Sequence, residues 1–243
     1  PPEAHGVVEA PRFGAQQFDI ADGEQEHLHQ TRRQAEPAER VAEEVGGEPW
    51  VVDLGDTAAL AEVSLDIDIL VNNAGIQHVA RIEDFPVERW DAIIAINLSS
   101  AFHATRLALP AMRQADWGRI INVASVHGLV ASAEKSAYVA AKHGIVGLTK
   151  VTALENATTG VTCNAICPGW VLTPLVQKQV DAKAAALGIS NDEAKKVLLG
   201  EKEPSMQFTT PDELGELAAF FCSSAGNNVR GVAWTMDGGW IAQ

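Results

Sequence analysis

The chain contains 243 residues, of which 47% are hydrophobic and 21% are charged, and its formal net charge is -14. This length can bury a substantial core, while the acidic balance argues against nucleic acid, because phosphate binding needs clustered Lys and Arg. We find no apolar run as long as a membrane span and no charged-then-apolar leader. We therefore expect a soluble, cytoplasmic protein with no membrane or nucleic-acid partner.

The first forty residues have an atypical composition, rich in Gln, Glu, Arg, His and Pro and poor in Val, Ile and Leu. Only residues 5–9 and 17–20 look briefly strand-like, and the composition changes abruptly at Glu48. This composition resembles out-of-frame translation, and we offer the hypothesis that the recorded start contains a sequencing or frame error or, alternatively, that the lesion is genuine. An intact mass that matches the sequence would exclude the first alternative.

After residue 48, apolar segments alternate with helical segments, most of them longer than ten residues. We expect strands at residues 49–54, 67–72, 119–124, 160–167 and 231–236. Helices are expected from Asp56 to about 63, and at 87–112, 136–156, within 174–201 and 211–222. Strands that are almost continuously apolar indicate a parallel sheet covered on both faces. The sequence therefore predicts an α/β fold in which residues 1–243 form one domain, a single doubly wound parallel sheet with an atypical N-terminal part.

Polar or small residues follow three of the predicted strands. They are Asn72-Asn-Ala-Gly75, Ser125 and Pro168-Gly169. Because ligands of such sheets bind beyond the carboxyl ends of the strands, we expect these residues to share one crevice.

A tyrosine and a lysine four residues apart lie in the helix predicted after Ser125. Tyr138 is the only tyrosine of the chain, and Lys142 projects to the same side of the helix. A nearby ammonium favours phenolate, so this pair can supply a general base. The same spacing also occurs by chance in many helices. Asn97 interrupts the apolar face of the preceding helix, which predicts a buried hydrogen-bond partner.

The three cysteines are too few for a disulfide framework and lack zinc-binding spacing. Cys163 and Cys167 are four apart in a predicted strand, so we interpret them as buried structural thiols. No His-Glu-x-x-His pattern occurs, and we predict no catalytic metal.

Taken in order, Asn72-Asn-Ala-Gly75, Asn97, Ser125, Tyr138-x-x-x-Lys142 and Pro168-Gly169 resemble the short-chain dehydrogenase/reductase family. The resemblance covers about residues 50–243. It implies a Rossmann-type fold, a nicotinamide cofactor and hydride transfer at an alcohol carbon. The catalytic residues that it implies are Asn97, Ser125, Tyr138 and Lys142. The implied cofactor contacts are Asp53, Leu54, Asn73, Ala74, Gly75, Tyr138, Lys142, Pro168, Gly169, Val171 and Thr173.

Within this family, residues 75–78, 125–128, 168–179 and 237–240 are similar to bacterial D-3-hydroxybutyrate dehydrogenases. This resemblance implies an enzyme that oxidises (R)-3-hydroxybutyrate to acetoacetate, with NAD as the cofactor and a tyrosine as the general base. It also implies a homotetramer and a role in ketone body metabolism. A small hydroxy acid needs donors at its carboxylate and an apolar wall at its methyl end. The substrate-binding residues that the resemblance implies are Gln77, His127, Lys135, Trp170, Gln179 and Trp240.

The family's Thr-Gly-x-x-x-Gly-x-Gly phosphate turn is not found near the start of the chain. Gly6, Gly14 and Gly23 are too widely spaced for it. Two alternatives therefore stay open, a 3-oxoacyl reductase of the same family and a cofactor-less binding or regulatory relative. The predicted carboxylate site argues against the first, because a thioester has no free carboxylate. The complete catalytic set argues against the second.

Overall fold

The computed structural model describes residues 13–14, 39, 41–48, 50, 52–56 and 65–242, and for Phe13, Gly14 and Leu175 only the backbone. These residues form a five-stranded parallel sheet with the order β1-β2-β3-β4-β5. The strands are β1 (Phe13–Gly14), β2 (Ile69–Asn72), β3 (Gly118–Val123), β4 (Val161–Pro168) and β5 (Ala233–Met236). The predicted parallel sheet is confirmed, with the last four strands within about two residues of their expected positions.

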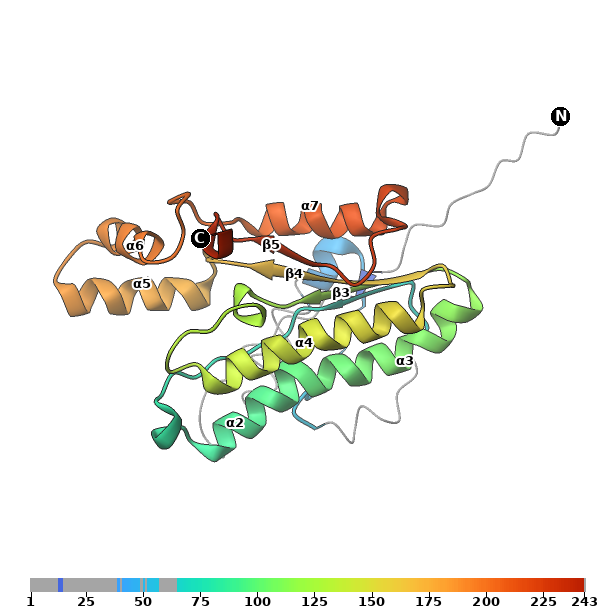
Figure 1. The fold of residues 1–243 in the computed structure, drawn as a ribbon, viewed down its shortest axis with the longest axis horizontal. Helices are drawn as coiled ribbons and strands as arrows, with labels where there is room; N and C mark the ends of the chain where they lie inside the picture. Colours follow the sequence, from blue (N-terminus) through green and yellow to red (C-terminus); the bar gives the residue numbers. More distant parts are fainter. Residues whose placement is uncertain are drawn as a thin grey trace.

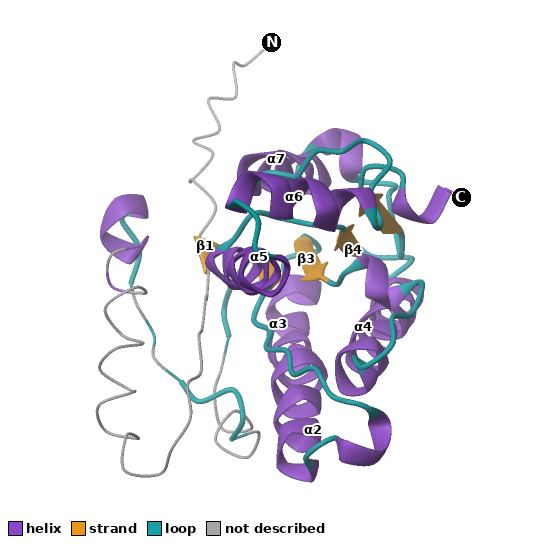
Figure 2. Ribbon diagram, turned by 90° about the vertical axis from the view of Figure 1, so that its left-hand side faces the viewer, coloured by secondary structure: helices purple, strands orange, loops and turns teal. Residues whose placement is uncertain are grey.

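Helices cover both faces of the sheet, as the apolar strands predicted (Figure 1). One face carries α2 (Val87–Ile94), the π-helical segment η3 (Ala95–Ser99), α3 (Ser100–Gln114) and α4 (Ser136–Glu155), and the other carries α7 (Pro211–Cys222). Beyond the carboxyl ends of the strands lie α5 (Pro174–Leu187) and α6 (Asn191–Gly200) (Figures 1 and 2). The described residues also contain four short 3-10 helices, η2 (Ile82–Asp84), η4 (Val126–Gly128), η5 (Ser224–Gly226) and η6 (Trp240–Ala242).

Alternate side chains of β3 enter the two layers of the core, because successive side chains of a strand point to opposite faces. Ile120 packs with Ala108 and Met112 of α3. Ile121 packs with Phe221 of α7 on the other face. All of these side chains are at most 1% exposed. This two-sided burial explains why β3 carries adjacent apolar residues rather than a strict alternation, as suits the central strand of the described sheet.

A buried asparagine joins the sheet to α4. Asn122 of β3 donates to Thr149 Oγ1 of α4 at 2.8 Å and accepts from Asn72 Nδ2 of β2 at 2.8 Å. Its side chain is fully buried, so these bonds satisfy groups that no water reaches. Asn122 therefore adds a side-chain link between the paired strands β2 and β3 and anchors α4 to β3.

The strand predicted at residues 49–54 is wrong in its described part. Residues 52–56 contain a turn, in which Asp53 Oδ1 accepts from the Gly55 amide at 2.8 Å and the Asp53 carbonyl accepts from the Asp56 amide at 3.2 Å. An aspartate that bonds its own following backbone competes with strand pairing. The strand-like residues 5–9 and 17–20 and the helix expected at 57–63 lie outside the described residues, whereas Phe13–Gly14 between the first two forms β1.

The expectation that no apolar segment is as long as a membrane span also needs correction. The continuous helix Val87–Gln114, which comprises α2, η3 and α3, is long and apolar enough to cross a membrane by length and composition alone. Of its most apolar 18-residue window, 39% is buried in the protein. The helix packs on α4, β2 and β3, which explains its apolar composition by contact with the core.

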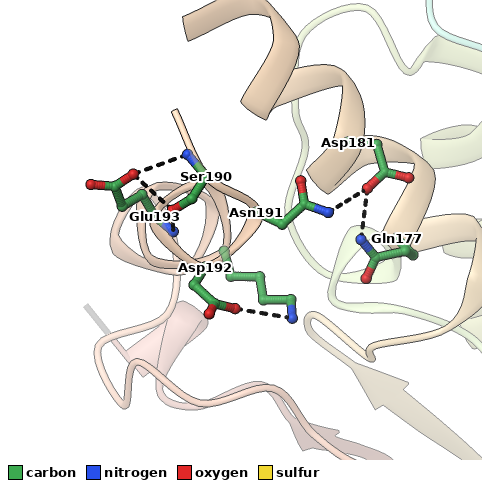
Figure 3. A network of polar contacts seen from close by, with 7 residues as sticks. Gln177, Asp181, Ser190, Asn191, Asp192 and Glu193 are labelled. Atoms are coloured by element: carbon green, nitrogen blue, oxygen red, sulfur yellow. Dashed lines mark hydrogen bonds and ion pairs between the residues drawn. The ribbon is translucent and has the colours of Figure 1, made fainter. Parts of the chain in front are cut away.

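A polar network holds α5 and α6 together at the carboxyl end of the sheet (Figure 3). Asp181 accepts from Gln177 at 2.8 Å and from Asn191 at 2.9 Å. Ser190 and Glu193 form a reciprocal capping box that starts α6. These bonds order a helical pair that otherwise contacts the sheet little, and so they shape one wall of the space beyond the strands.

Replacing Asn122 tests its role as the link between β2, β3 and α4. We expect Asn122→Ala to lower the free energy of unfolding by about 1–3 kcal/mol, because it leaves buried polar partners unsatisfied. Reversible urea unfolding measures this change. The control Asn228→Ala, at an exposed asparagine, should lie within about 0.5 kcal/mol of the parent chain. Equal effects of the two substitutions would contradict the assigned role.

Candidate active site

The carboxyl ends of β2, β3 and β4 open onto one cavity of about 470 Å³. This volume falls in the range of small-molecule sites, about 300–1,000 Å³. The cavity is lined by all six predicted substrate residues, by Ser125, Tyr138 and Lys142, and by seven of the other predicted cofactor contacts. The latter are Asn73, Ala74, Gly75, Pro168, Gly169, Val171 and Thr173.

Asp53 and Leu54, which were also predicted to contact the cofactor, do not line this cavity. They belong to the turn at residues 52–56 rather than to a strand end. The strand on which that prediction depended is not formed in this part of the chain, so the structure gives it no support.

Lys142 is a buried cation with a neutral acceptor. Its Nζ donates to the carbonyl oxygen of Val123, the last residue of β3, at 2.8 Å, and its side chain is only 4% exposed. Burial lowers the pKa of Lys142 to about 8, and Cys167 offsets this only in part. The ammonium therefore ties α4 to the end of β3 and points into the cavity.

Tyr138 lies one helical turn before Lys142 and borders the same cavity. Burial raises the pKa of its phenol, and the interaction with the Ser125 hydroxyl lowers it in part. The sequence pattern predicted that Lys142 would lower this pKa. In the structure Lys142 Nζ lies 5.6 Å from the centre of the tyrosine ring and is bonded to Val123, so burial prevails and the phenol is the resting form.

Asn97 has the buried partner that its position on an apolar helix predicted. It lies in the π-helical segment η3, where Oδ1 accepts from the Ile76 amide at 2.9 Å and Nδ2 donates to the Ile76 carbonyl at 3.0 Å. Asn97 is 2% exposed and does not line the cavity. Asn97 instead holds Ile76, and both Ile76 and the preceding Gly75 line the cavity. A π-helical segment such as η3 is often found at a functional site.

His127 is a neutral hydrogen-bonding group at the cavity wall. Its Nε2 lies 2.9 Å from Ser132 Oγ and its Nδ1 lies 3.4 Å from Ser125 Oγ. Burial, followed by the charges of Lys135, Lys202 and His143, lowers its pKa to about 4. At neutral pH the imidazole is therefore uncharged, and one nitrogen donates while the other accepts.

Two tryptophans and a lysine form a second part of the cavity wall. The rings of Trp170 and Trp240 lie 6.3 Å apart, and His127 contacts the edge of Trp240 at 5.4 Å. Lys135 Nζ lies 5.6 Å from the centre of the Trp170 ring. Burial lowers the pKa of Lys135, and the charge of Lys202 lowers it further. An apolar wall and a cation thus face the same space.

The two glutamines of α5 differ in what they contact. Gln177 donates to Asp181 within α5 (Figure 3), whereas Gln179 lines the cavity. The resemblance selected Gln179 over Gln177, and the structure places Gln179 where a ligand can reach it. Gln77, from the loop after β2, lines the cavity from the other side.

The described residues fit the nicotinamide and ribose end of a dinucleotide. A Cβ added at Gly75 would lie 3.7 Å from both Asn97 Nδ2 and Lys142 Nζ, so glycine leaves the floor of the cavity open toward the ammonium. Pro168, Gly169 and the Thr173 cap of α5 border the same floor. Backbone and ammonium donors around an open apolar strip suit a ribose and an amide-bearing ring.

Sequence reasoning missed three residues around the cavity. Ser132 contacts His127, Lys202 Nζ lies 5.6 Å from the centre of the Trp240 ring, and Glu203 Oε1 accepts from the Trp170 amide. Glu203 is 1% exposed, and burial raises its pKa to about 7. Lys202 and Glu203 directly follow α6, and nothing in the sequence around them indicates that they contact the tryptophans of the cavity. Only the fold reveals these contacts.

Comparisons with known proteins agree with this geometry. The chain is 77% identical over 176 residues to a D-beta-hydroxybutyrate dehydrogenase of Cupriavidus necator and 55% identical over 176 residues to one of Rhizobium meliloti. In each case the match covers 72% of this chain and 68% of the relative. Among solved structures, actinorhodin polyketide ketoreductase with NADPH matches with a TM-score of 0.76 at 28% identity, over 86% of this chain and 84% of that one.

The sequence profile of the short chain dehydrogenase family matches residues 18–184. This match begins before residue 50, where the motifs alone placed the start of the resemblance. The chain therefore belongs to the short-chain dehydrogenase family.

Proposed function

We propose that this protein oxidises (R)-3-hydroxybutyrate to acetoacetate with NAD. One observation carries the proposal, namely that a single cavity is lined by Ser125, Tyr138 and Lys142 and also by the proposed carboxylate-binding residues and two tryptophans. The identity of 77% to a D-beta-hydroxybutyrate dehydrogenase supports the same substrate.

Tyr138 is the proposed base of the reaction, and Ser125 the proposed donor to the reacting oxygen. The Tyr138 phenolate takes the proton of the substrate hydroxyl, while the Ser125 hydroxyl holds that oxygen. A nicotinamide cofactor held by Lys142 and the Asn73–Gly75 segment would supply the hydride acceptor for the hydroxyl-bearing carbon, so that the substrate becomes a ketone. Lys142 supplies positive charge beside Tyr138, and Asn97 positions the segment after Gly75 that borders the site.

The substrate carboxylate is proposed to bind Lys135, Gln77, Gln179 and His127. A buried carboxylate is costly unless it is paired, and one cation with neutral donors offsets that cost. His127 suits this role because its imidazole is uncharged at neutral pH, and it can donate to the carboxylate where the substrate replaces one of its two serine partners. The rings of Trp170 and Trp240 leave room for an apolar methyl end.

NAD, rather than NADP, is proposed from the resemblance to the hydroxybutyrate dehydrogenases. In this family an acidic residue after the second strand of the complete fold meets the ribose. That position is not β2 of this structure; it is expected within about the first forty residues, most of which lie outside the described part of the chain. Lys142 and the backbone of Asn73 to Gly75 are the proposed contacts of the nicotinamide ribose. A cytoplasmic location and a role in ketone body metabolism stay predictions.

Replacing the tyrosine tests its role as the base. We expect Tyr138→Phe to lower kcat for 3-hydroxybutyrate by at least about a hundredfold while cofactor affinity changes little. In the parent chain kcat/KM should rise with pH above neutrality, because burial raises the pKa of Tyr138 and deprotonation supplies the base. NADH absorbance across pH measures both. A variant that keeps the parent rate would exclude Tyr138 as the base.

Substrate choice tests the carboxylate site. NADH formation from 3-hydroxybutyrate should far exceed that from its methyl ester or from a 3-hydroxyacyl thioester, because only the acid can pair with Lys135. Lys135→Ala should raise KM for the acid roughly tenfold to a hundredfold. The control Lys150→Ala, at an exposed lysine of α4, should leave KM unchanged. Equal rates with acid and ester would favour a general reductase, and no turnover of any substrate would favour a cofactor-less relative.

A homotetramer is the proposed assembly. Large apolar side chains are exposed on α2, α3 and α4, including Trp90, Phe102 and Leu154 at 39%, 47% and 76%. Such side chains suit an interface between subunits. Sedimentation velocity should show four subunits per particle, and a monomer at micromolar concentration would contradict the assembly.

A further inference from the structure

Two lysines, rather than one, lie on the tryptophan wall of the cavity. Lys135 Nζ is 5.6 Å from the centre of the Trp170 ring, and Lys202 Nζ is 5.6 Å from the centre of the Trp240 ring. The two rings lie 6.3 Å apart, and, in addition to burial, the charge of Lys202 lowers the pKa of both Lys135 and His127, so the two ammonium groups act on the same part of the site. Lys202 itself does not line the cavity, whereas Trp240, which its ammonium group contacts, does.

The segment after α6 is docked firmly enough to hold Lys202 in this position. The Lys202 amide donates to the Leu199 carbonyl at 3.0 Å, and the Ser205 amide donates to the Gly238 carbonyl at 3.0 Å. Between them, the buried Glu203 side chain accepts from the Trp170 amide. The segment is therefore bonded both to the wall residue Trp170 and to the loop that carries Trp240.

No carboxylate of the described chain neutralises the two lysines. No ion pair links Lys135 or Lys202 to an acid among these residues. Glu203 is engaged by the Trp170 amide, and Asp237 accepts from the amides of Gly239 and Ile241 at 3.2 and 3.0 Å. In addition to burial, the charge of Lys202 lowers the pKa of Lys135, so the two like charges destabilise each other, and an anion bound at Lys135 would offset that cost.

We propose that Lys202 is a second cation of the substrate site, a specificity-determining residue that acts with Lys135 to select a carboxylate-bearing substrate. The inference rests on the proposed function. A chain with a formal net charge of -14 repels an anionic substrate at long range, and a local pair of cations reverses the field at the mouth of the cavity. Lys202 acts through this field and not by contact with the reacting atoms.

Steady-state kinetics of Lys202→Gln test the proposal. We expect KM for 3-hydroxybutyrate to rise roughly three- to tenfold, because one unscreened positive charge near the carboxylate is lost. We expect kcat to stay within about twofold, because the charge acts on both the ground state and the transition state. Lys202→Arg should restore KM, since it keeps the cation.

The salt dependence separates a field effect from a structural one. Between about 10 and 500 mM salt, kcat/KM of the parent chain should fall more steeply than that of Lys202→Gln, because screening removes an attraction that the variant lacks. Lys195→Gln, which removes a lysine that pairs with Asp192 on α6, is the matched control and should behave like the parent. Identical KM and salt dependence in the Lys202 and Lys195 variants would overturn the proposal.

A binding measurement keeps this test independent of turnover. Calorimetric titration with 3-hydroxybutyrate should show weaker binding to Lys202→Gln than to the parent and to Lys202→Arg. Equal affinity in all three would overturn the role of Lys202. Absence of NADH formation in the parent chain would instead overturn the proposed function, so the two failures are distinguishable. Circular dichroism of each variant verifies that it is folded.

Discussion

The site depends on one buried hydrogen bond, from the ammonium of Lys142 to the carbonyl oxygen of Val123. A charge with only a neutral acceptor is expensive to bury, and the fall of the Lys142 pKa to about 8 reflects that cost. The surrounding contacts of α4 with β3 and β4 must offset it. In return, the bond sets the register of α4 on the sheet and so places Tyr138, one turn earlier, beside Ser125.

Other polar groups around the cavity are also held by uncharged hydrogen-bond partners. Asn97 satisfies both backbone groups of Ile76, and His127 stays neutral between Ser125 and Ser132. Beside the cavity, Lys135 and Lys202 have no ion-pair partner among the described residues, and both ammonium groups lie against the rings of the tryptophan wall. An acidic protein thus carries a local positive site suited to a small anion, while the reacting groups at the strand ends are held by neutral partners.

Much of this could be predicted from local patterns, because they reflect local physics. Apolar runs predicted β2 to β5, and the spacing of Tyr138 and Lys142 predicted that they share a face of α4. The strand expected at residues 49–54 failed because the Asp53 side chain bonds its own turn, which a hydrophobic pattern does not reveal. Lys202 and Glu203 were missed for another reason. They contact the cavity-lining residues Trp240 and Trp170 only because of the docking of α6 and the final loop, which are distant in sequence from the catalytic residues.

A crystal structure of the protein with 3-hydroxybutyrate bound would test the central claim most directly. The account predicts that the carboxylate lies within hydrogen-bond distance of Lys135 and Gln77, with the hydroxyl oxygen between Ser125 and Tyr138 and the methyl group on the tryptophan wall. A substrate bound in the opposite sense, with its carboxylate at Lys142 or outside the cavity, would contradict it.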